Sequence, residues 1–286
     1  MVDRPVIIKN DIKQGVENMY KLIAIDMDGT LLREDKTISD KTKNMIKKAI
    51  EKGVKIVLAS GRPIEGLERY LEELQLVTED DFVMSFNGSI IQNVKTKAII
   101  SKNILKGRDL KVLYNLSKEI GVNIHAFTKQ GCVTPSMNEY SQLEGRINGI
   151  EVHEIDFNTI DDEEDVIKVM FIDPEPVLTA AIEKIPENVY KDFTVVRSAP
   201  YFLEFLNKAS SKGTGVKALS EYLGIKREEV ICIGDAGNDL DMIQFAGLGV
   251  AMGNAFEEVK AVADYVTLDN DSDGVAHVIE KFITIS

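Results

Sequence analysis

The chain has 286 residues, of which 44% are hydrophobic, and it carries a formal net charge of −13. This length and composition predict one large domain or two modest ones with a sizeable buried core. The acidic balance disfavours a general nucleic-acid binder, which usually has a basic face. No apolar run reaches the roughly 20 residues that a membrane span needs. An acidic chain can still bind an anionic substrate where a metal ion or a few Lys and Arg residues supply local positive charge.

The N-terminal stretch MVDRPVIIKNDIKQG is mixed and charged and lacks the apolar segment of a signal peptide, so we expect a cytoplasmic protein with no membrane partner. Cys132 and Cys232 fit neither a disulfide framework nor a zinc pattern. We interpret Cys232, within the apolar segment VICIG, as a buried structural thiol. His125, His153 and His277 lack metal-ligand spacing, and we assign them surface or structural roles.

The first part of the chain alternates predicted strands and helices. Residues 21–26, KLIAID, form an apolar run that ends in an acid, which is typical of a parallel strand buried on both faces. The elements expected next are a helix capped by Ser39 and ended by Gly53, a strand at 54–60, a helix opened by Pro63, and a strand at 82–86 before a turn at Asn87-Gly88.

The middle of the chain, about 87–196, has shorter and more polar predicted strands. A hairpin turn is expected near Asn93, a helix at 108–120 and a strand at 166–172, which together favour an α+β domain with an open sheet. After Lys212 the alternation returns. Helices are expected at about 215–223, 238–245, 255–263 and 275–282, and strands at 229–235, 248–252 and the segment YVT.

This order predicts an α/β core, residues 19–87 and 197–286, interrupted by an inserted α+β domain at 88–196. Residues 1–18 precede the first core strand and are interpreted as an N-terminal extension, a cloning remnant or a misassigned start. A short extra strand or arm is the alternative for this segment.

The strongest chemical signal is the pair Asp26 and Asp28, which directly follows the first buried strand. Ligands bind at the carboxyl ends of strands in open α/β sheets. Two acids at this spacing would lie near one reacting atom, where one can attack and the other can move a proton. Gly29 would let the chain turn sharply behind them. A polar turn after a strand is the alternative.

A second acidic motif, Gly234-Asp235-Ala-Gly237-Asn238-Asp239, also follows a buried strand. Asp235 and Asp239 are four residues apart across a loop that opens a helix. Clustered carboxylates suit a hard divalent cation with oxygen ligands, and Mg²⁺ in particular. Asp239 could instead act only as a helix-capping acid.

Two further motifs could hold a phosphate group. Ser60-Gly61-Arg62-Pro63 combines a hydroxyl with the N–H groups of a helix start. Lys212, at another helix start, is a compact charge suited to a phosphoryl oxygen. Helix capping and a solvated lysine are the alternatives. The predicted strand ends meet at one edge of the sheet, where the resulting cluster of acids would require a bound cation.

The four motifs together resemble the haloacid dehalogenase superfamily, in its Cof-type branch with a large cap, and are most similar to the YidA-type sugar-phosphate phosphatases. The segments that carry the resemblance are LIAIDMDGTLL, ASGRP, SAPYFLEFLNKASSKGTGVKAL and IGDAGNDLDMIQFAGLGVAMGNA, with the insert between the second and the third. The resemblance covers nearly everything after residue 18. It implies a Rossmann-like parallel-sheet core with an inserted α+β cap of the C2 type.

The resemblance also implies roles for the acidic residues. Asp26 would be the nucleophile, and Asp28 would protonate the leaving oxygen and then activate water. Mg²⁺ would be held by Asp26, the Asp28 backbone carbonyl and Asp235, while Asp239 would bind it through water or orient its ligands. This implies a Mg²⁺-dependent phosphatase that cleaves small phosphorylated metabolites, most of all sugar phosphates, through a phospho-aspartate.

The remaining implied contacts concern the substrate. Ser60, Gly61, Lys212 and Asn238 would hold the phosphoryl oxygens, and the cap would close over the site and select the leaving group. For Arg62, Asn87, Gly88 and Glu204, substrate contact and a hinge or packing role both stay open. The oligomeric state is open as well.

Two other functions compete with hydrolysis. A phosphomutase would have to bind a second phosphate, usually through cap arginines. Arg108, Arg146 and Arg197 are the arginines between residues 88 and 200, and they are widely spread without a paired pattern. A non-catalytic phosphate-ligand sensor on the same scaffold is disfavoured by the intact pair of Asp26 and Asp28.

Overall fold

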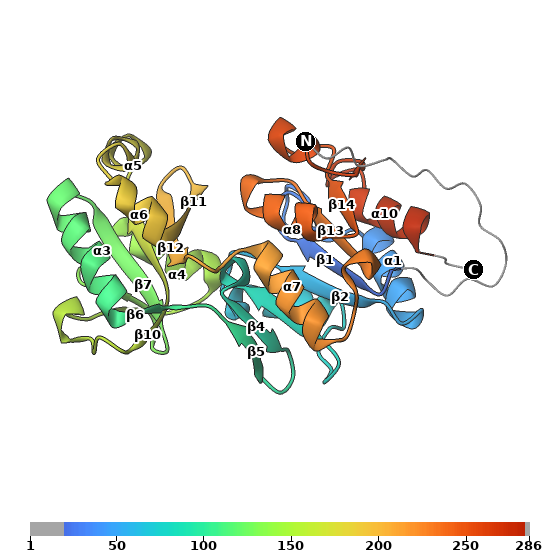
Figure 1. Ribbon diagram of the computed structural model, residues 1–286, viewed down its shortest axis with the longest axis horizontal. Coiled ribbons are helices and arrows are strands. Elements are labelled where there is room, and N and C mark those ends of the chain that lie inside the picture. The colour runs from blue at the N-terminus through green and yellow to red at the C-terminus, as the bar shows by residue number, and fades with distance from the viewer. Residues whose placement is uncertain (1–19, 284–286) are drawn as a thin grey trace. The chain divides into compact units, whose positions relative to one another are not determined.

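The computed structural model describes residues 20–283, which form two compact units (Figure 1). The first unit comprises residues 20–58 and 216–283, and the second comprises residues 59–215. The predicted boundaries of core and insert (19–87 with 197–286, and 88–196) stay a prediction. The predicted extension, 1–18, lies outside the described residues. None of the described helices is long and apolar enough to cross a membrane.

The first unit is built on parallel strands in the order β15-β14-β13-β1-β2. Strand β1 pairs in parallel with β13, β13 with β14, and β14 with β15. Every residue of β1, β13 and β14 is buried, as predicted for strands covered on both faces. The strands are β1 (Leu22–Asp26), β2 (Lys55–Ala59), β13 (Val230–Gly234), β14 (Leu248–Ala251) and β15 (Tyr265–Val266).

Helices of the first unit pack against these strands and against one another. Helix α1 (Asp40–Glu51) begins where the Ser39 hydroxyl accepts a hydrogen bond from the Thr42 N–H, as the predicted cap requires. It packs beside α10 (Gly274–Phe282), while α8 (Leu240–Phe245) packs on β13 and β14 (Figure 1). The other helical segments are η4 (Arg227–Glu229), η5 (Gly237–Asp239), α9 (Glu257–Lys260) and α7 (Lys212–Tyr222), whose first residues, 212–215, belong to the second unit.

The second unit begins with a small antiparallel arrangement of β3 (Phe82–Ser85), β4 (Ile90–Asn93) and β5 (Ile99–Lys102). The predicted turn near Asn93 joins β4 to β5, and its side-chain oxygen accepts hydrogen bonds from the N–H groups of Lys95 and Thr96. The short helix η2 (Phe86–Gly88) links β3 to β4.

The larger sheet of the second unit has the order β11-β12-β10-β7-β8-β9, with β6 beside β10. Most pairs are antiparallel, which confirms the predicted α+β character. Its strands are β6 (Leu105–Lys106), β7 (Asn123–Thr128), β8 (Gly131–Thr134), β9 (Val152–Glu154), β10 (Asp165–Ile172), β11 (Phe193–Ala199) and β12 (Phe202–Asn207).

The two faces of this sheet bury different sets of side chains. One face packs against α3 (Gly107–Ile120), α5 (Glu175–Ile182) and α6 (Glu187–Asp192) and is apolar. The other face packs against α4 (Glu139–Asn148) and η2, and it combines apolar side chains with buried polar ones. Strand residues alternate between the faces, so that Phe171 lies on the first and Met170 on the second.

Two predicted helices are shorter than expected. The helix opened by Pro63 is a 3₁₀ turn, η1 (Ile64–Gly66), followed by α2 (Glu68–Glu73). The two are divided at Leu67, whose φ of −109° is far from the roughly −63° of a regular α-helix. The helix expected at 255–263 is reduced to α9, because Phe256 has an extended backbone and donates its N–H to the Asp235 carbonyl.

Candidate active site

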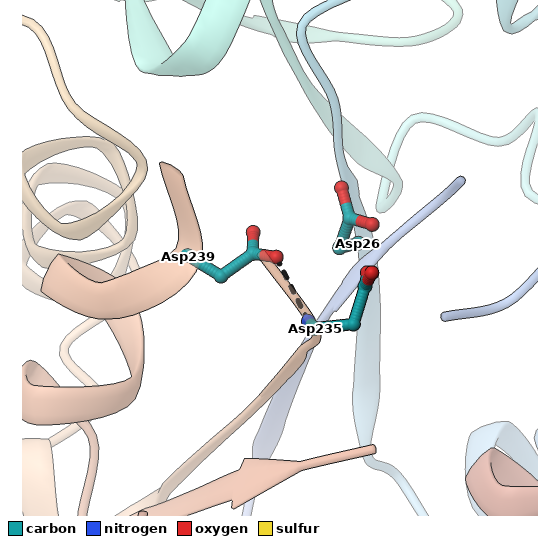
Figure 2. Close-up of side chains that lie close together, drawn as sticks. All are labelled: Asp26, Asp235 and Asp239. Carbon is teal, nitrogen blue, oxygen red and sulfur yellow. Dashed lines mark hydrogen bonds between the residues drawn. The ribbon is translucent and has the colours of Figure 1, made fainter. Parts of the chain in front are cut away.

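Three aspartates meet at the carboxyl ends of adjacent strands. Asp26 is the last residue of β1, and Asp235 directly follows β13, which pairs with β1 in parallel register. Asp239 ends η5 in the next turn of the chain. Each of the three offers a carboxylate oxygen within 4.8 Å of the others (Figure 2). The parallel pairing therefore brings two motifs that are 209 positions apart in the sequence, counting from Asp26 to Asp235, to one point.

Hydrogen bonds orient two of these carboxylates. The Thr30 hydroxyl donates to Oδ1 of Asp235 at 2.8 Å. Oδ2 of Asp239 accepts from the backbone N–H groups of Asp235 at 3.0 Å and Ala236 at 3.1 Å (Figure 2). Asp239 thus caps the start of η5, as predicted for a helix-capping acid. Its carboxylate also belongs to the cluster with Asp26 and Asp235.

The cluster fits a hard divalent cation. Asp26 is 7% exposed and Asp239 is fully buried, so their charges are poorly solvated as well as mutually repulsive. A cation bound by carboxylate oxygens removes both penalties, and Mg²⁺ prefers such oxygen ligands. Gly29 packs closely against this cluster. A Cβ atom added to Gly29 would lie 2.4 Å from Oδ2 of Asp235, so a larger residue at position 29 would clash with that carboxylate.

Asp28 lies outside this group of three. Its side chain is 43% exposed, and its Oδ1 accepts a hydrogen bond from Nζ of Lys36 at 2.8 Å. Asn254 donates to the Gly29 carbonyl at 2.8 Å and braces the same loop. Asn238 lies in η5 and is partly exposed. Lys36 lies outside the quoted motifs. Asn254 is near the end of the segment IGDAGNDLDMIQFAGLGVAMGNA, and Thr30 follows Gly29 directly, so both lie within quoted motifs although no role was predicted for them.

Three of the four residues predicted to hold phosphate, Ser60, Gly61 and Lys212, lie in the second unit around the turn Asn87-Gly88, whereas Asn238 lies in the first unit. The carbonyl of Ser60 accepts a hydrogen bond from the Asn87 N–H at 2.8 Å, and its hydroxyl accepts from the Arg62 N–H at 3.2 Å. A Cβ atom added to Gly61 would lie 3.1 Å from Nδ2 of Asn87. The Asn87 side chain therefore lies against the segment Ser60-Gly61.

The backbone of Ser211 and Lys212 contacts the same turn at Gly88. A Cβ atom added to Gly88 would lie 2.2 Å from the Ser211 carbonyl oxygen and 3.3 Å from the Lys212 nitrogen, so the two backbones are in close contact. Lys212 is the first residue of α7 and is fully buried, which excludes the alternative of a solvated loop lysine. That all four motifs act on one phosphate stays a prediction.

The two cysteines are buried structural residues. Burial, together with the nearby Asp239 carboxylate, raises the pKa of the Cys232 thiol well above its ordinary value. Burial raises the pKa of the Cys132 thiol to about 12. Neither thiol therefore supplies a reactive thiolate near neutral pH, and the interpretation of Cys232 as structural is confirmed.

Residues 23–279 match the family model described as haloacid dehalogenase-like hydrolase. The chain is 44% identical over 270 residues to the Bacillus subtilis protein named "Putative phosphatase YxeH", an alignment that covers 93% of this chain and 99% of that protein. It is 32% identical over 264 residues to 5-amino-6-(5-phospho-D-ribitylamino)uracil phosphatase YcsE of the same organism, covering 92% and 96%.

Solved structures give the same result. A haloacid dehalogenase-like hydrolase from Bacteroides thetaiotaomicron superposes with a TM-score of 0.81 at 38% identity, covering 92% of this chain and 99% of that one. A subclass IIB sugar phosphatase of the superfamily superposes with a TM-score of 0.76 at 27% identity, covering 92% and 98%. With its sheet of parallel strands and the family match over nearly all of the described residues, the chain belongs to the haloacid dehalogenase-like hydrolase family.

Proposed function

We propose that this protein is a Mg²⁺-dependent phosphatase that hydrolyses small phosphorylated metabolites through a phospho-aspartate on Asp26. The observation that carries the proposal is the cluster of Asp26, Asp235 and Asp239 at the ends of β1 and β13, in a chain of this hydrolase family. We also propose that the protein is a sugar phosphatase of the YidA type, the branch that its sequence motifs most resemble.

Asp26 and Asp28 divide the chemistry. A carboxylate oxygen of Asp26 attacks phosphorus in line, the phosphorus–oxygen bond to the leaving group breaks, and Asp28 gives the leaving oxygen a proton. Water then attacks the phospho-aspartate, Asp28 takes its proton, and inorganic phosphate leaves. The environments suit these roles, because Asp26 is buried at a strand end whereas Asp28 is exposed and can exchange protons with solvent.

Asp26, the Asp28 backbone carbonyl and Asp235 would hold Mg²⁺, and Asp239 would contribute through water or by orienting the other ligands. The bound ion supplies positive charge that offsets the charge of the phosphoryl oxygens. Asp239 already fixes the loop of Asp235 through two backbone hydrogen bonds, which supports its orienting role.

Ser60, Gly61, Lys212 and Asn238 would hold the phosphoryl oxygens. Ser60, Gly61 and Lys212 all adjoin the turn Asn87-Gly88, which supports a common task. Lys212 is fully buried, and the compact positive charge of its ammonium group suits the oxygens of a phosphate dianion.

Sugar phosphates are the proposed substrates. One structural relative is titled a sugar phosphatase, and one sequence relative is named for a substrate with a phosphorylated ribityl chain. Both names describe a phosphate ester on a polyhydroxylated carbon chain. We therefore expect such an ester to be cleaved fastest, with the larger sheet of the second unit belonging to the cap that selects it.

A phosphomutase fits less well. Arg108 contacts Glu163 in an ion pair. Arg197 donates to the Thr179 hydroxyl and to the Pro200 carbonyl. These two arginines are thus already engaged in local contacts of the second unit, which disfavours their use as a site for a second phosphate.

The test is phosphate release from sugar phosphates, nucleotides and cofactor phosphates, with and without Mg²⁺, using Asp26→Asn as the control. We expect release that requires both Mg²⁺ and Asp26, and the ranking of substrates should place polyol and sugar phosphates first. If no compound is hydrolysed although the ligands still bind, the hydrolase proposal is wrong and a mutase or a sensor becomes the better explanation.

A further inference from the structure

A group of charged side chains is buried in the second unit, on the face of the larger sheet that packs against α4 and η2. Lys168 of β10 lies 3.4 Å from Oε1 of Glu204 in β12 and 3.6 Å from Oε1 of Glu144 in α4. The three residues are 2%, 3% and 4% exposed, in the same order. Burying such charges costs several kcal/mol for each ion unless they are paired in good geometry.

The neighbours of this group are apolar. The ammonium of Lys168 lies 4.8 Å from the centre of the Phe127 ring and 5.7 Å from that of Phe86. Met170 and Phe202 complete the same face. Well-packed apolar residues in place of a buried ion pair are often neutral or stabilising, so a buried charged group is weak evidence of a stabilising role and favours a different task.

Glu204 connects this group to the turn that holds the predicted phosphate residues. Its Oε1 is the oxygen near Lys168, while its Oε2 accepts a hydrogen bond from Nδ2 of Asn87 at 3.4 Å. Asn87 in turn lies against Gly61 and donates its N–H to the Ser60 carbonyl. A continuous path of contacts thus runs from Lys168 through Glu204 and Asn87 to the segment Ser60-Gly61.

The turn needs such support because its backbone is strained. Phe86 and Asn87 have positive φ angles of 51° and 54°, and Gly88 follows at 87°. Left-handed conformations of residues other than glycine cost of the order of 1–3 kcal/mol and persist only where the surroundings hold them in place. Asn87 is held in part by the two hydrogen bonds it donates, one from its side chain to the Glu204 carboxylate and one from its backbone N–H to the Ser60 carbonyl.

We propose that Glu204 is a positioning residue for the phosphate-holding segment Ser60-Gly61, acting through Asn87 and anchored by Lys168. This inference rests on the proposed function. Direct contact between Glu204 and the substrate is disfavoured, because the side chain is buried and both carboxylate oxygens have protein partners. A residue that places the phosphate should affect all phosphate esters equally, whatever their leaving group.

The first test is Glu204→Gln, with Glu144→Gln as the matched control. Gln cannot accept from both Lys168 and Asn87, so kcat/KM should fall by roughly ten- to a hundredfold, and by the same factor for every substrate of the panel. Glu144 is similarly buried and also contacts Lys168, but the hydrogen bond that its backbone carbonyl accepts comes from Asn148 of α4 and not from Asn87. Its variant should keep near wild-type kcat/KM. Equal losses in both variants, or a loss that differs among leaving groups, would overturn the proposal.

The second test is a double-mutant cycle with Asn87→Gly, a change that tolerates the left-handed backbone. If Glu204 acts through Asn87, adding Glu204→Gln to Asn87→Gly should lower kcat/KM no further, whereas additive losses would refute the path. Should Glu204→Gln fail to fold by circular dichroism, the triple variant Lys168→Met/Glu144→Gln/Glu204→Gln removes the three buried charges together and should show the same loss.

Calorimetric titration with inorganic phosphate in the presence of Mg²⁺ separates this proposal from the proposed function. If the wild-type protein hydrolyses nothing but binds phosphate, weaker binding by Glu204→Gln supports the positioning role on its own. Unchanged phosphate binding by the variant, or no phosphate binding by the wild type, would refute it.

Discussion

The contact between Gly29 and Asp235 offers a sharp test of the metal site. Gly29 has a φ of +82°, and a Cβ atom placed on it would lie 2.4 Å from Oδ2 and 2.8 Å from Cγ of Asp235. Gly29→Ala therefore pushes against a proposed metal ligand without removing any ligand from the chain. It also adds the strain of a left-handed alanine, about 1–2 kcal/mol.

The size of the displacement follows from the contact distance. Ordinary van der Waals contact begins at 3.4 Å, so the Asp235 carboxylate must move by about 1 Å. Metal–ligand distances tolerate only about 0.2 Å, and even residues outside the coordination shell change metal affinity by about 10- to 100-fold. We expect Gly29→Ala to weaken Mg²⁺ binding by at least about a hundredfold.

The assay is a Mg²⁺ titration of phosphate release, with calorimetric Mg²⁺ binding as a second measurement. Gly53→Ala is the matched control, because Gly53 has a φ of +80° but has nothing within 4 Å of an added Cβ atom. The two variants should lose similar stability in thermal melts. A Mg²⁺ affinity in Gly29→Ala equal to that of Gly53→Ala would refute the assignment of Asp235 as a ligand.

Two further predictions concern buried groups. Asp239→Asn retains one carbonyl oxygen that can accept from the N–H groups of Asp235 and Ala236, so the variant should fold but bind Mg²⁺ about tenfold more weakly; unchanged Mg²⁺ affinity in calorimetry would exclude a role for its charge. Burial, reinforced by the positive charge of Lys168, lowers the pKa of His125 in the folded protein to about 3. In the unfolded chain its pKa is about 6.5, so between these two values the unfolded chain binds a proton on His125 and the folded protein does not. The free energy of unfolding should therefore fall by about 2 kcal/mol between pH 7 and pH 5 on account of His125, and His125→Leu should remove that decrease in denaturant melts followed by circular dichroism; an unchanged pH slope would contradict it.

The parallel part of the fold could be predicted because its signals are local. The apolar runs of β1 and β13 are unbroken, and each is followed directly by an aspartate. Parallel strands in one sheet bring such ends together, so the meeting of Asp26 and Asp235 required no knowledge of long-range detail. The helix after Pro63 was predicted less well, because the proline indicates a start but nothing in the sequence shows that Leu67 interrupts the helix.

The buried charges of the second unit could not be predicted in this way. Lys168 stands within the apolar segment VIKVMFI, where alternation alone would place a lysine toward solvent. Its partner Glu204 is 36 positions away on the neighbouring strand. The contact depends on the antiparallel register that sets Met170 opposite Glu204, and register is a property of the assembled sheet.

Carboxylates gather both around Lys168 and in the cluster of Asp26, Asp235 and Asp239. In the second unit the ammonium of Lys168 lies beside Glu144 and Glu204. Burial alone would lower the pKa of Lys168, but the two carboxylates outweigh it and the pKa is raised, so the lysine stays charged. At the ends of β1 and β13, the Thr30 hydroxyl and the backbone N–H groups of Asp235 and Ala236 are among the donors to the carboxylates of Asp235 and Asp239.

The carboxylates of Asp26, Asp235 and Asp239 concentrate negative charge at one point. This charge would repel a phosphate dianion, and the net charge of −13 would add to that repulsion. A bound divalent cation reverses the sign of the local field at this one point, while the rest of the acidic surface continues to repel anions that cannot reach the cation. On this reasoning the same three carboxylates that hold the metal also make phosphate binding depend on it.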